Sequence, residues 1–150
     1  MAQSLAKNLI HLIYSTKNRT SCLSPEVRSA LYAYKAGILK ECESPAILIG
    51  CAADHVHVFI RLSKNHPLAK VIEAVKKGSS KWLKTQGPAF QGFHWQTGYG
   101  AFSLSQSHAD QVVRYIEGQE EHHRTRSFED EFRAFLNRHG VEYDERYVWD

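Results

Sequence analysis

The clearest pattern along the chain is a strict alternation of apolar and other side chains over residues 54–62 (DHVHVFIRL). Alternation with period two is typical of a β-strand, because successive side chains of a strand point to opposite faces of the sheet. One face of this strand would carry Val56, Val58, Ile60 and Leu62, and we expect it in the core. The opposite face would carry His55 and His57, so both imidazoles would point the same way.

Similar patterns predict the remaining elements. Apolar, β-prone runs predict strands at 8–16 and 45–53, and an aromatic, glycine-punctuated run at 93–104 predicts one strand or two short ones with a bend at 98–100. Apolar stripes with helical spacing, opened by Ser or Pro, predict helices that begin near Pro25, Pro67, Ser107 and Ser127. We expect the aromatic tail 141–150 to pack back on the domain.

The predicted order is β-α-β-β-α-β-α-α. This order, with helices in the two crossovers, predicts an α+β class and a ferredoxin-like, split β-α-β antiparallel sheet. We expect helices on one face of this sheet, together with a C-terminal helix that bears a tyrosine, Tyr115. The face that carries His55 and His57 is expected to stay open.

Length and composition indicate one domain over residues 1–150. The three cysteines are widely spaced and form no CxxC pair, which favours reduced thiols in a cytoplasmic protein. We expect no membrane association, because no apolar run approaches the ~20 residues of a membrane helix and the N-terminus lacks a signal-peptide pattern. The net charge of +3 permits nucleic-acid binding without proving it.

Two imidazoles on one strand face could supply two ligands of a divalent-metal site, but such a site needs a third ligand. Tyr115 and Gln119 are four residues apart and would share one face of a helix. The amide oxygen of Gln119 could be the third ligand, which would bring Tyr115 to the metal. Spacing alone favours plainer roles, a half-buried tyrosine and a solvated glutamine. His122 and His123 lie one turn further on and could replace Gln119.

Basic residues suggest a second surface. The helix at 67–84 is expected to carry lysines in a narrow stripe without interleaved acids, with small hydroxyls beside them. A solvated helix face and a phosphate-binding face explain this stripe about equally well. The basic loop at 17–19 raises the same alternative. The candidate DNA-binding residues are Lys70, Lys77, Ser79, Ser80, Lys81, Lys84 and Arg19.

Several of these segments together resemble the single-tyrosine HUH transposases of the insertion sequence 200/605 family, where HUH means His-hydrophobic-His. The segments are STKNR, DHVHVFI, KGSSKWL, FHWQTGYGAFSLS and RYIEGQEEHH. The HVH tripeptide alone is a weak signal. Its combination with WQTGYG and with a YxxxQ pair about sixty residues later is specific, and the resemblance spans nearly the whole chain.

The resemblance implies a homodimer acting on single-stranded DNA that carries a hairpin near the element's end. His55, His57 and Gln119 would bind Mg²⁺ or Mn²⁺. Tyr115 would attack the scissile phosphate and form a 5′-phosphotyrosine link, leaving a free 3′-hydroxyl. In this family the tyrosine helix can reach across the dimer, so assembly of the active site in cis or in trans stays open.

Two other functions are consistent with parts of the pattern. A non-catalytic, single-stranded nucleic-acid-binding module of ferredoxin-like fold would need neither Tyr115 nor a metal. A metal-dependent hydrolase of another substrate would keep its turnover after Tyr115→Phe. Neither alternative accounts for the His pair, WQTGYG and YxxxQ together.

Overall fold

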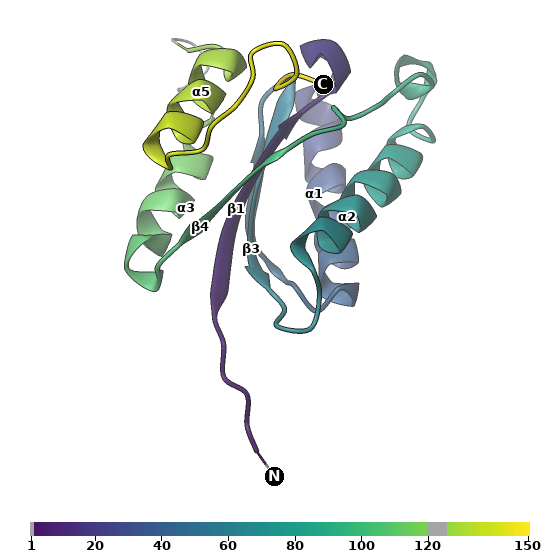
Figure 1. Cartoon of the computed structure of the whole chain (residues 1–150). Helices are drawn as coiled ribbons and strands as arrows, with labels where there is room; N and C mark the ends of the chain where they lie inside the picture. The colour runs from purple at the N-terminus through teal and green to yellow at the C-terminus, as the bar shows by residue number, and fades with distance from the viewer. Residues whose placement is uncertain (1, 120–125) are drawn as a thin grey trace.

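The computed structural model describes residues 2–119 and 126–150 and contains one four-stranded antiparallel sheet (Figure 1). Its strands are β1 (Asn8–Ser15), β2 (Ala46–Cys51), β3 (His55–Leu62) and β4 (Gly100–Leu104), in the spatial order β2-β3-β1-β4. The helices are α1 (Pro25–Glu41), α2 (Leu68–Leu83), α3 (Ala109–Glu117) and α5 (Phe128–Arg138). Short 3₁₀ turns occupy Lys17–Arg19, Pro88–Phe90 and Gln106–His108. The predicted order and the ferredoxin-like α+β fold are confirmed.

One face of the sheet is covered by α1 and α2 (Figure 1). Val56 and Val58 of β3 point into this layer with Leu12 of β1, and all three side chains are fully buried. Leu31 of α1 and Val75 of α2 complete the contact. The alternation along β3 therefore assigned the core-facing side chains correctly.

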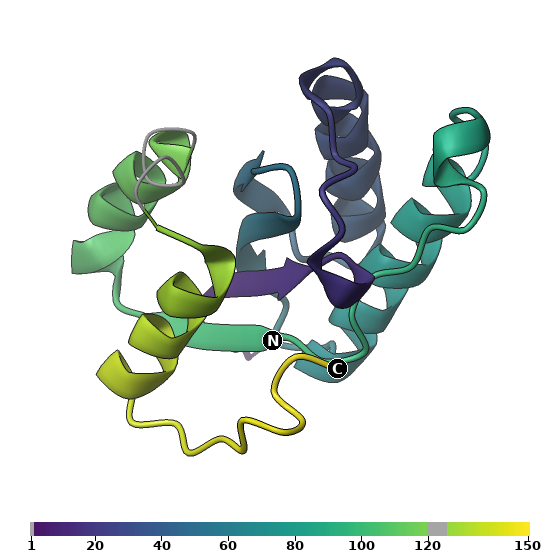
Figure 2. The same cartoon turned by 90° about the horizontal axis from the view of Figure 1, so that it is seen from above.

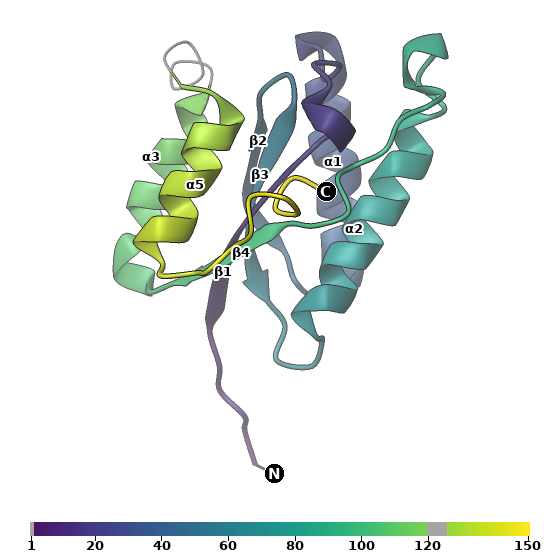
Figure 3. The same cartoon turned by 45° about the horizontal axis from the view of Figure 1, so that its top comes forward.

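The opposite face is not open, and this part of the prediction is wrong. Helices α3 and α5 lie side by side over it, as the turned views show (Figures 2 and 3). Phe128 and Phe132 of α5 pack with Ile13 of β1, and Ile116 of α3 packs with Phe59 of β3. An apolar helix stripe needs a surface to cover, and the sheet face that carries the histidines provides it.

The aromatic run at 93–104 forms less strand than predicted, since only Gly100–Leu104 joins the sheet and Trp95 adds an isolated bridge to Thr16. The backbone carbonyl oxygens of residues 96–98, which precede β4, accept hydrogen bonds from a side chain of α2. Lys76 donates to the carbonyl oxygens of Gln96 (2.8 Å), Thr97 and Gly98. These contacts hold residues 96–98 against α2, while the amide of Gln96 donates to the carbonyl oxygen of Ser15 at the end of β1 at 2.9 Å.

The C-terminal tail packs back on the domain, as predicted. Trp149 lies edge-on to Phe128 and Phe132 of α5, and the amide of Gly98 donates to the carbonyl oxygen of Asp150 at 2.7 Å. The tail therefore joins α5 to the loop before β4. Within residues 2–119 and 126–150, the helices are too short or too polar to cross a membrane.

Candidate active site

Strand β3 directs both histidines under α5, where they meet the carboxylate of Glu131. One oxygen of this carboxylate, Oε1, lies 3.3 Å from Nε2 of His55 and 3.0 Å from Nε2 of His57. Both imidazoles are fully buried, and Glu131 is 1% exposed. The three side chains thus bring two imidazole nitrogens and one carboxylate oxygen together inside the protein.

The other ring nitrogen of each histidine is also held. Nδ1 of His55 donates to the carboxylate of Asp54 at 2.7 Å, and Nδ1 of His57 lies 2.8 Å from Nε2 of His11 on the neighbouring strand β1. Partners of this kind fix the orientation and the tautomer of a ligating imidazole. They turn Nε2 of each histidine toward Glu131.

Burial and neighbouring charges set the protonation of these groups. Burial acts to lower the pKa of His55, but the hydrogen bonds to Asp54 and Glu131 outweigh it and leave this pKa above its ordinary value. The pKa of His11 lies well below its usual range, first because the ring is buried and then because His57 is close. A neutral His11 can accept the Nδ1 proton of His57, so Nε2 of His57 could offer its lone pair to a cation that replaced its 3.0 Å hydrogen bond with Glu131.

Tyr115 reaches the same carboxylate from α3. Its hydroxyl donates to Oε2 of Glu131, and its ring lies edge-on to His57 with centroids 5.8 Å apart. Burial, and then the negative charge of Glu131, raises the pKa of Tyr115, so the hydroxyl is protonated in this state. The histidine pair and the tyrosine therefore converge within one chain.

Glu131 was missed by the sequence analysis, although the sequence contains a signal for it. It lies three residues after Phe128 and four before Phe135, so it belongs to the buried apolar stripe of α5. A carboxylate in such a stripe is seldom buried without a partner. That position could have identified it as a candidate for the site.

The predicted helix ends sooner than expected: α3 stops at Glu117, so Gln119 lies past its C-cap Gly118 and not on the same helix as Tyr115. Gln119 is buried rather than solvated, with 3% of its surface exposed. Its amide nitrogen donates to the carbonyl oxygen of Tyr115 at 3.2 Å. It also lines a cavity of about 710 Å³ beside β2, together with Cys51 and Tyr32. Its role as a metal ligand stays a prediction, and His122 and His123 lie outside the described residues.

The arrangement fits a divalent cation. The candidate ligand atoms of His55, His57 and Glu131 all lie within 4.8 Å of one another. Imidazole and carboxylate are common ligands of first-row divalent metals, and a site with two imidazoles is softer than the all-oxygen sites typical of Mg²⁺. The donor set therefore suits a first-row divalent metal better than Mg²⁺.

The lysine stripe of α2 is exposed, but it does contain an acid, contrary to the prediction. Glu73 lies 3.6 Å from Lys70 and 3.1 Å from Lys77. Such exposed pairs are weak, so they leave both ammonium groups available to an anion. Beside the stripe is a cavity of about 570 Å³, whose lining includes Lys76, Lys77, Ser80, Lys81, Lys84, Trp95 and Tyr99.

Two predicted DNA contacts have partners inside the protein. Ser79 is fully buried, where its hydroxyl donates to Val75 and accepts from the indole of Trp95, so it is not available at the surface. Nε of Arg19 lies 3.6 Å from Glu129, and its guanidinium lies over the ring of Trp149. DNA would have to compete with these contacts for Arg19.

A family model and two solved structures are similar to this chain. A family model described as "Transposase IS200 like" matches residues 4–119, and no curated protein matches. A solved candidate transposase of Deinococcus radiodurans R1 is 24% identical, with a TM-score of 0.62 over 79% of this chain and 98% of that one. A REP-associated tyrosine transposase bound to a REP hairpin is 13% identical, with a TM-score of 0.61 over 82% of this chain and 73% of that one. At these identities the two structures support the fold alone.

Proposed function

Because the chain belongs to the IS200-like transposase family, we propose that it cleaves and rejoins single-stranded DNA through Tyr115 during excision and insertion of a transposon. One observation carries the proposal. The Tyr115 hydroxyl donates to the carboxylate that also contacts both histidines of the HVH motif. A nucleophile and a candidate metal site thus share one buried residue, Glu131.

The proposed reaction is a phosphoryl transfer. It needs no cofactor as a source of energy. The Tyr115 oxygen attacks the scissile phosphorus, the bond from phosphorus to the 3′-oxygen breaks, and a 5′-phosphotyrosine link forms. The departing 3′-oxygen becomes a free 3′-hydroxyl, which balances the proton lost by the tyrosine. Rejoining is the same step in reverse, with a 3′-hydroxyl as the nucleophile.

His55, His57 and Glu131 would hold a divalent cation, Mg²⁺ or Mn²⁺, which when bound polarises the attacked phosphate. Gln119, the third ligand implied by the family resemblance, remains an alternative to Glu131. Its contact with the Tyr115 carbonyl oxygen supports a different role, in which it stabilises the helical turn that carries the nucleophile. Asp54 and His11 would orient the two imidazoles.

The substrate that we propose is single-stranded DNA with a hairpin. One fold neighbour is itself bound to a REP hairpin. The exposed lysines of α2 and the exposed ring of Tyr99 beside them supply the charge and the stacking surface that such a strand requires. The proposed homodimer rests on the family resemblance, while the contact between Tyr115 and Glu131 within one chain supports cleavage in cis.

The test is a cleavage assay on labelled strands from both flanks of the protein's own gene, with Mn²⁺ or with EDTA. In Mn²⁺, but not in EDTA, we expect one DNA fragment to remain on the protein under denaturing conditions. The other fragment should be released with a free 3′-hydroxyl. DNA retained only under native conditions, whatever the metal, would instead favour the non-catalytic binding module.

The assignment of Glu131 predicts the metal affinity of two variants. Glu131→Gln should weaken Mn²⁺ binding by at least about tenfold, because an amide is a poorer ligand than a carboxylate. Glu129→Gln on the same helix is the matched control, since Glu129 is half-buried and pairs with Arg19 instead. Calorimetric titration with Mn²⁺ measures the metal affinity of both variants. If Glu131→Gln kept its Mn²⁺ affinity and Gln119→Ala lost it, Gln119 rather than Glu131 would be the third ligand.

The lysine stripe predicts a salt effect. Lys81→Ala should weaken binding of a DNA hairpin and reduce the slope of log affinity against log salt by about one, because one phosphate contact is lost. Lys40→Ala, at the exposed end of α1, removes the same charge away from the cavity. Fluorescence anisotropy at several salt concentrations measures the slope. Equal slopes in the two variants would assign the stripe to a solvated helix face.

A further inference from the structure

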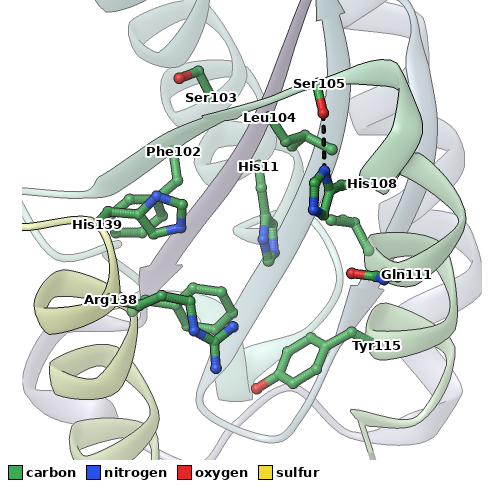
Figure 4. A pocket seen from close by; sticks show the side chains of 12 residues that line it. His11, Phe102, Ser103, Leu104, Ser105, His108, Gln111, Tyr115, Arg138 and His139 are labelled. Carbon is green, nitrogen blue, oxygen red and sulfur yellow. Dashed lines mark hydrogen bonds between the residues drawn. The ribbon is translucent and has the colours of Figure 1, made fainter.

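A cavity of about 700 Å³ lies between β4, α3 and α5, and Tyr115 forms part of its wall (Figure 4). His11, which contacts His57, also lines it, so the cavity reaches both the nucleophile and the support of the metal site. Its volume lies within the range of small-molecule sites and is large enough for a nucleotide. The remaining lining residues include Phe102, Ser105, His108, Gln111, Arg138 and His139.

Aromatic rings form one wall of this cavity. The ring of His139 stacks on Phe102, with centroids 4.6 Å apart and planes inclined by 23°, and lies nearly parallel to Phe135. Such flat faces accept a nucleobase of any sequence, because every base has a π-face. His139 is exposed, so a base can reach this wall from solvent.

The polar groups of the cavity suit a phosphodiester. None of its lining residues in the described part of the chain is Asp or Glu, whereas Arg138 contributes a guanidinium. This guanidinium lies over the Phe135 ring, with 5.5 Å to the centroid. Figure 4 shows the Tyr115 hydroxyl directed toward the side of the cavity where Arg138 lies. A cation near an attacking oxygen favours an anionic group at that end.

We propose that this cavity binds one nucleotide of the DNA strand next to the phosphate that Tyr115 attacks. The base would stack on the exposed ring of His139, which packs on the buried ring of Phe102, and the phosphate would contact Arg138. This inference rests on the proposed function and adds to it a subsite that binds the nucleotide beside the cleavage point whatever its base, distinct from the lysines of α2. The α2 lysines would hold the hairpin, and the cavity would set the position of the cut strand.

The test scans a single-stranded substrate with one abasic nucleotide at a time across the cleavage point, with EDTA present to prevent cleavage. The cleavage point is first located from the length of the released 3′-hydroxyl fragment. In the wild-type protein, an abasic nucleotide at one flanking position should weaken binding by about tenfold, the effect of losing one stacked base. Equal affinity for all abasic substrates would overturn the proposal.

Two variants assign the effect to the cavity. In His139→Ala, the penalty at that one flanking position should disappear. Arg138→Ala should weaken binding of the intact strand and lower its salt slope by about one. Arg146→Ala is the control, because it removes an equal charge from the exposed tail, where Arg146 pairs with Asp144. An undiminished penalty in His139→Ala would place the base elsewhere.

The outcomes separate this inference from the proposed function. A covalent adduct in the wild-type protein, without any flanking-base penalty, would leave strand cleavage standing and remove the subsite. Absence of the adduct, with a flanking penalty that depends on His139, would retain the subsite as part of a binding module and remove the cleavage chemistry.

Discussion

Tyr115→Phe should abolish covalent capture of DNA and reduce strand cleavage by roughly a thousandfold or more, the scale on which removal of a nucleophile acts. The substitution removes only the hydroxyl that donates to Oε2 of Glu131. The ring remains and keeps its edge-on contact with Phe135, so the fold should persist. Denaturing gels with a labelled single strand measure the adduct, and native gels measure binding.

The same variant distinguishes the proposed transposase from the non-catalytic binding module and from the metal-dependent hydrolase. Hairpin binding within about twofold of the wild-type value is expected, because Tyr115 is not one of the α2 residues proposed to hold DNA. Tyr147→Phe is a matched control, since Tyr147 lies exposed in the tail. Undiminished turnover in Tyr115→Phe would support the metal-dependent hydrolase instead.

His57→Ala has the second-largest expected effect, a loss of cleavage with near wild-type hairpin binding. The imidazole contributes one of the two nitrogens that face Glu131, and its other nitrogen contacts His11. Its removal would therefore disrupt both the candidate metal site and the orientation of His11. Cleavage in Mn²⁺ and native binding to the same hairpin are measured together, and the retained binding also shows that the variant is folded.

His66→Ala is the control for this variant, because His66 lies outside the site near Glu43. A mixture of His57→Ala and Tyr115→Phe adds a test of assembly. Since Tyr115 contacts the site of its own chain, the mixture should remain inactive. Recovery of cleavage in the mixture would show that the tyrosine serves its partner, and lost hairpin binding by His57→Ala would contradict the ligand assignment.

The histidine face could be predicted from the sequence because a strand has a two-residue period. Once 54–62 is taken as a strand, His55 and His57 must share a face, and the structure places them so. Helical spacing also predicts that Gln119 lies close to Tyr115, although α3 ends at Glu117, before Gln119 is reached. Local periods of this kind need no knowledge of the rest of the chain.

The closed face and Glu131 could not be predicted in the same way. The apolar stripe of α5 indicates that the helix is buried, but not which surface it covers. Glu131 meets Tyr115 and His57 only because α5 folds over the sheet, and no local spacing links these residues. Ser79 shows the same limit, since its burial depends on Trp95 in a distant loop.

The most direct test of the central claim, that Tyr115 attacks DNA beside His55, His57 and Glu131, is mass spectrometry of the trapped adduct. After nuclease and trypsin digestion, the peptide that begins after Arg114 contains Tyr115 as its first residue. We predict that this peptide carries a 5′-linked nucleotide when the reaction contains Mn²⁺, and that it is unmodified with EDTA or in Glu131→Ala. A nucleotide on another residue, or no adduct while cleavage proceeds, would contradict the account.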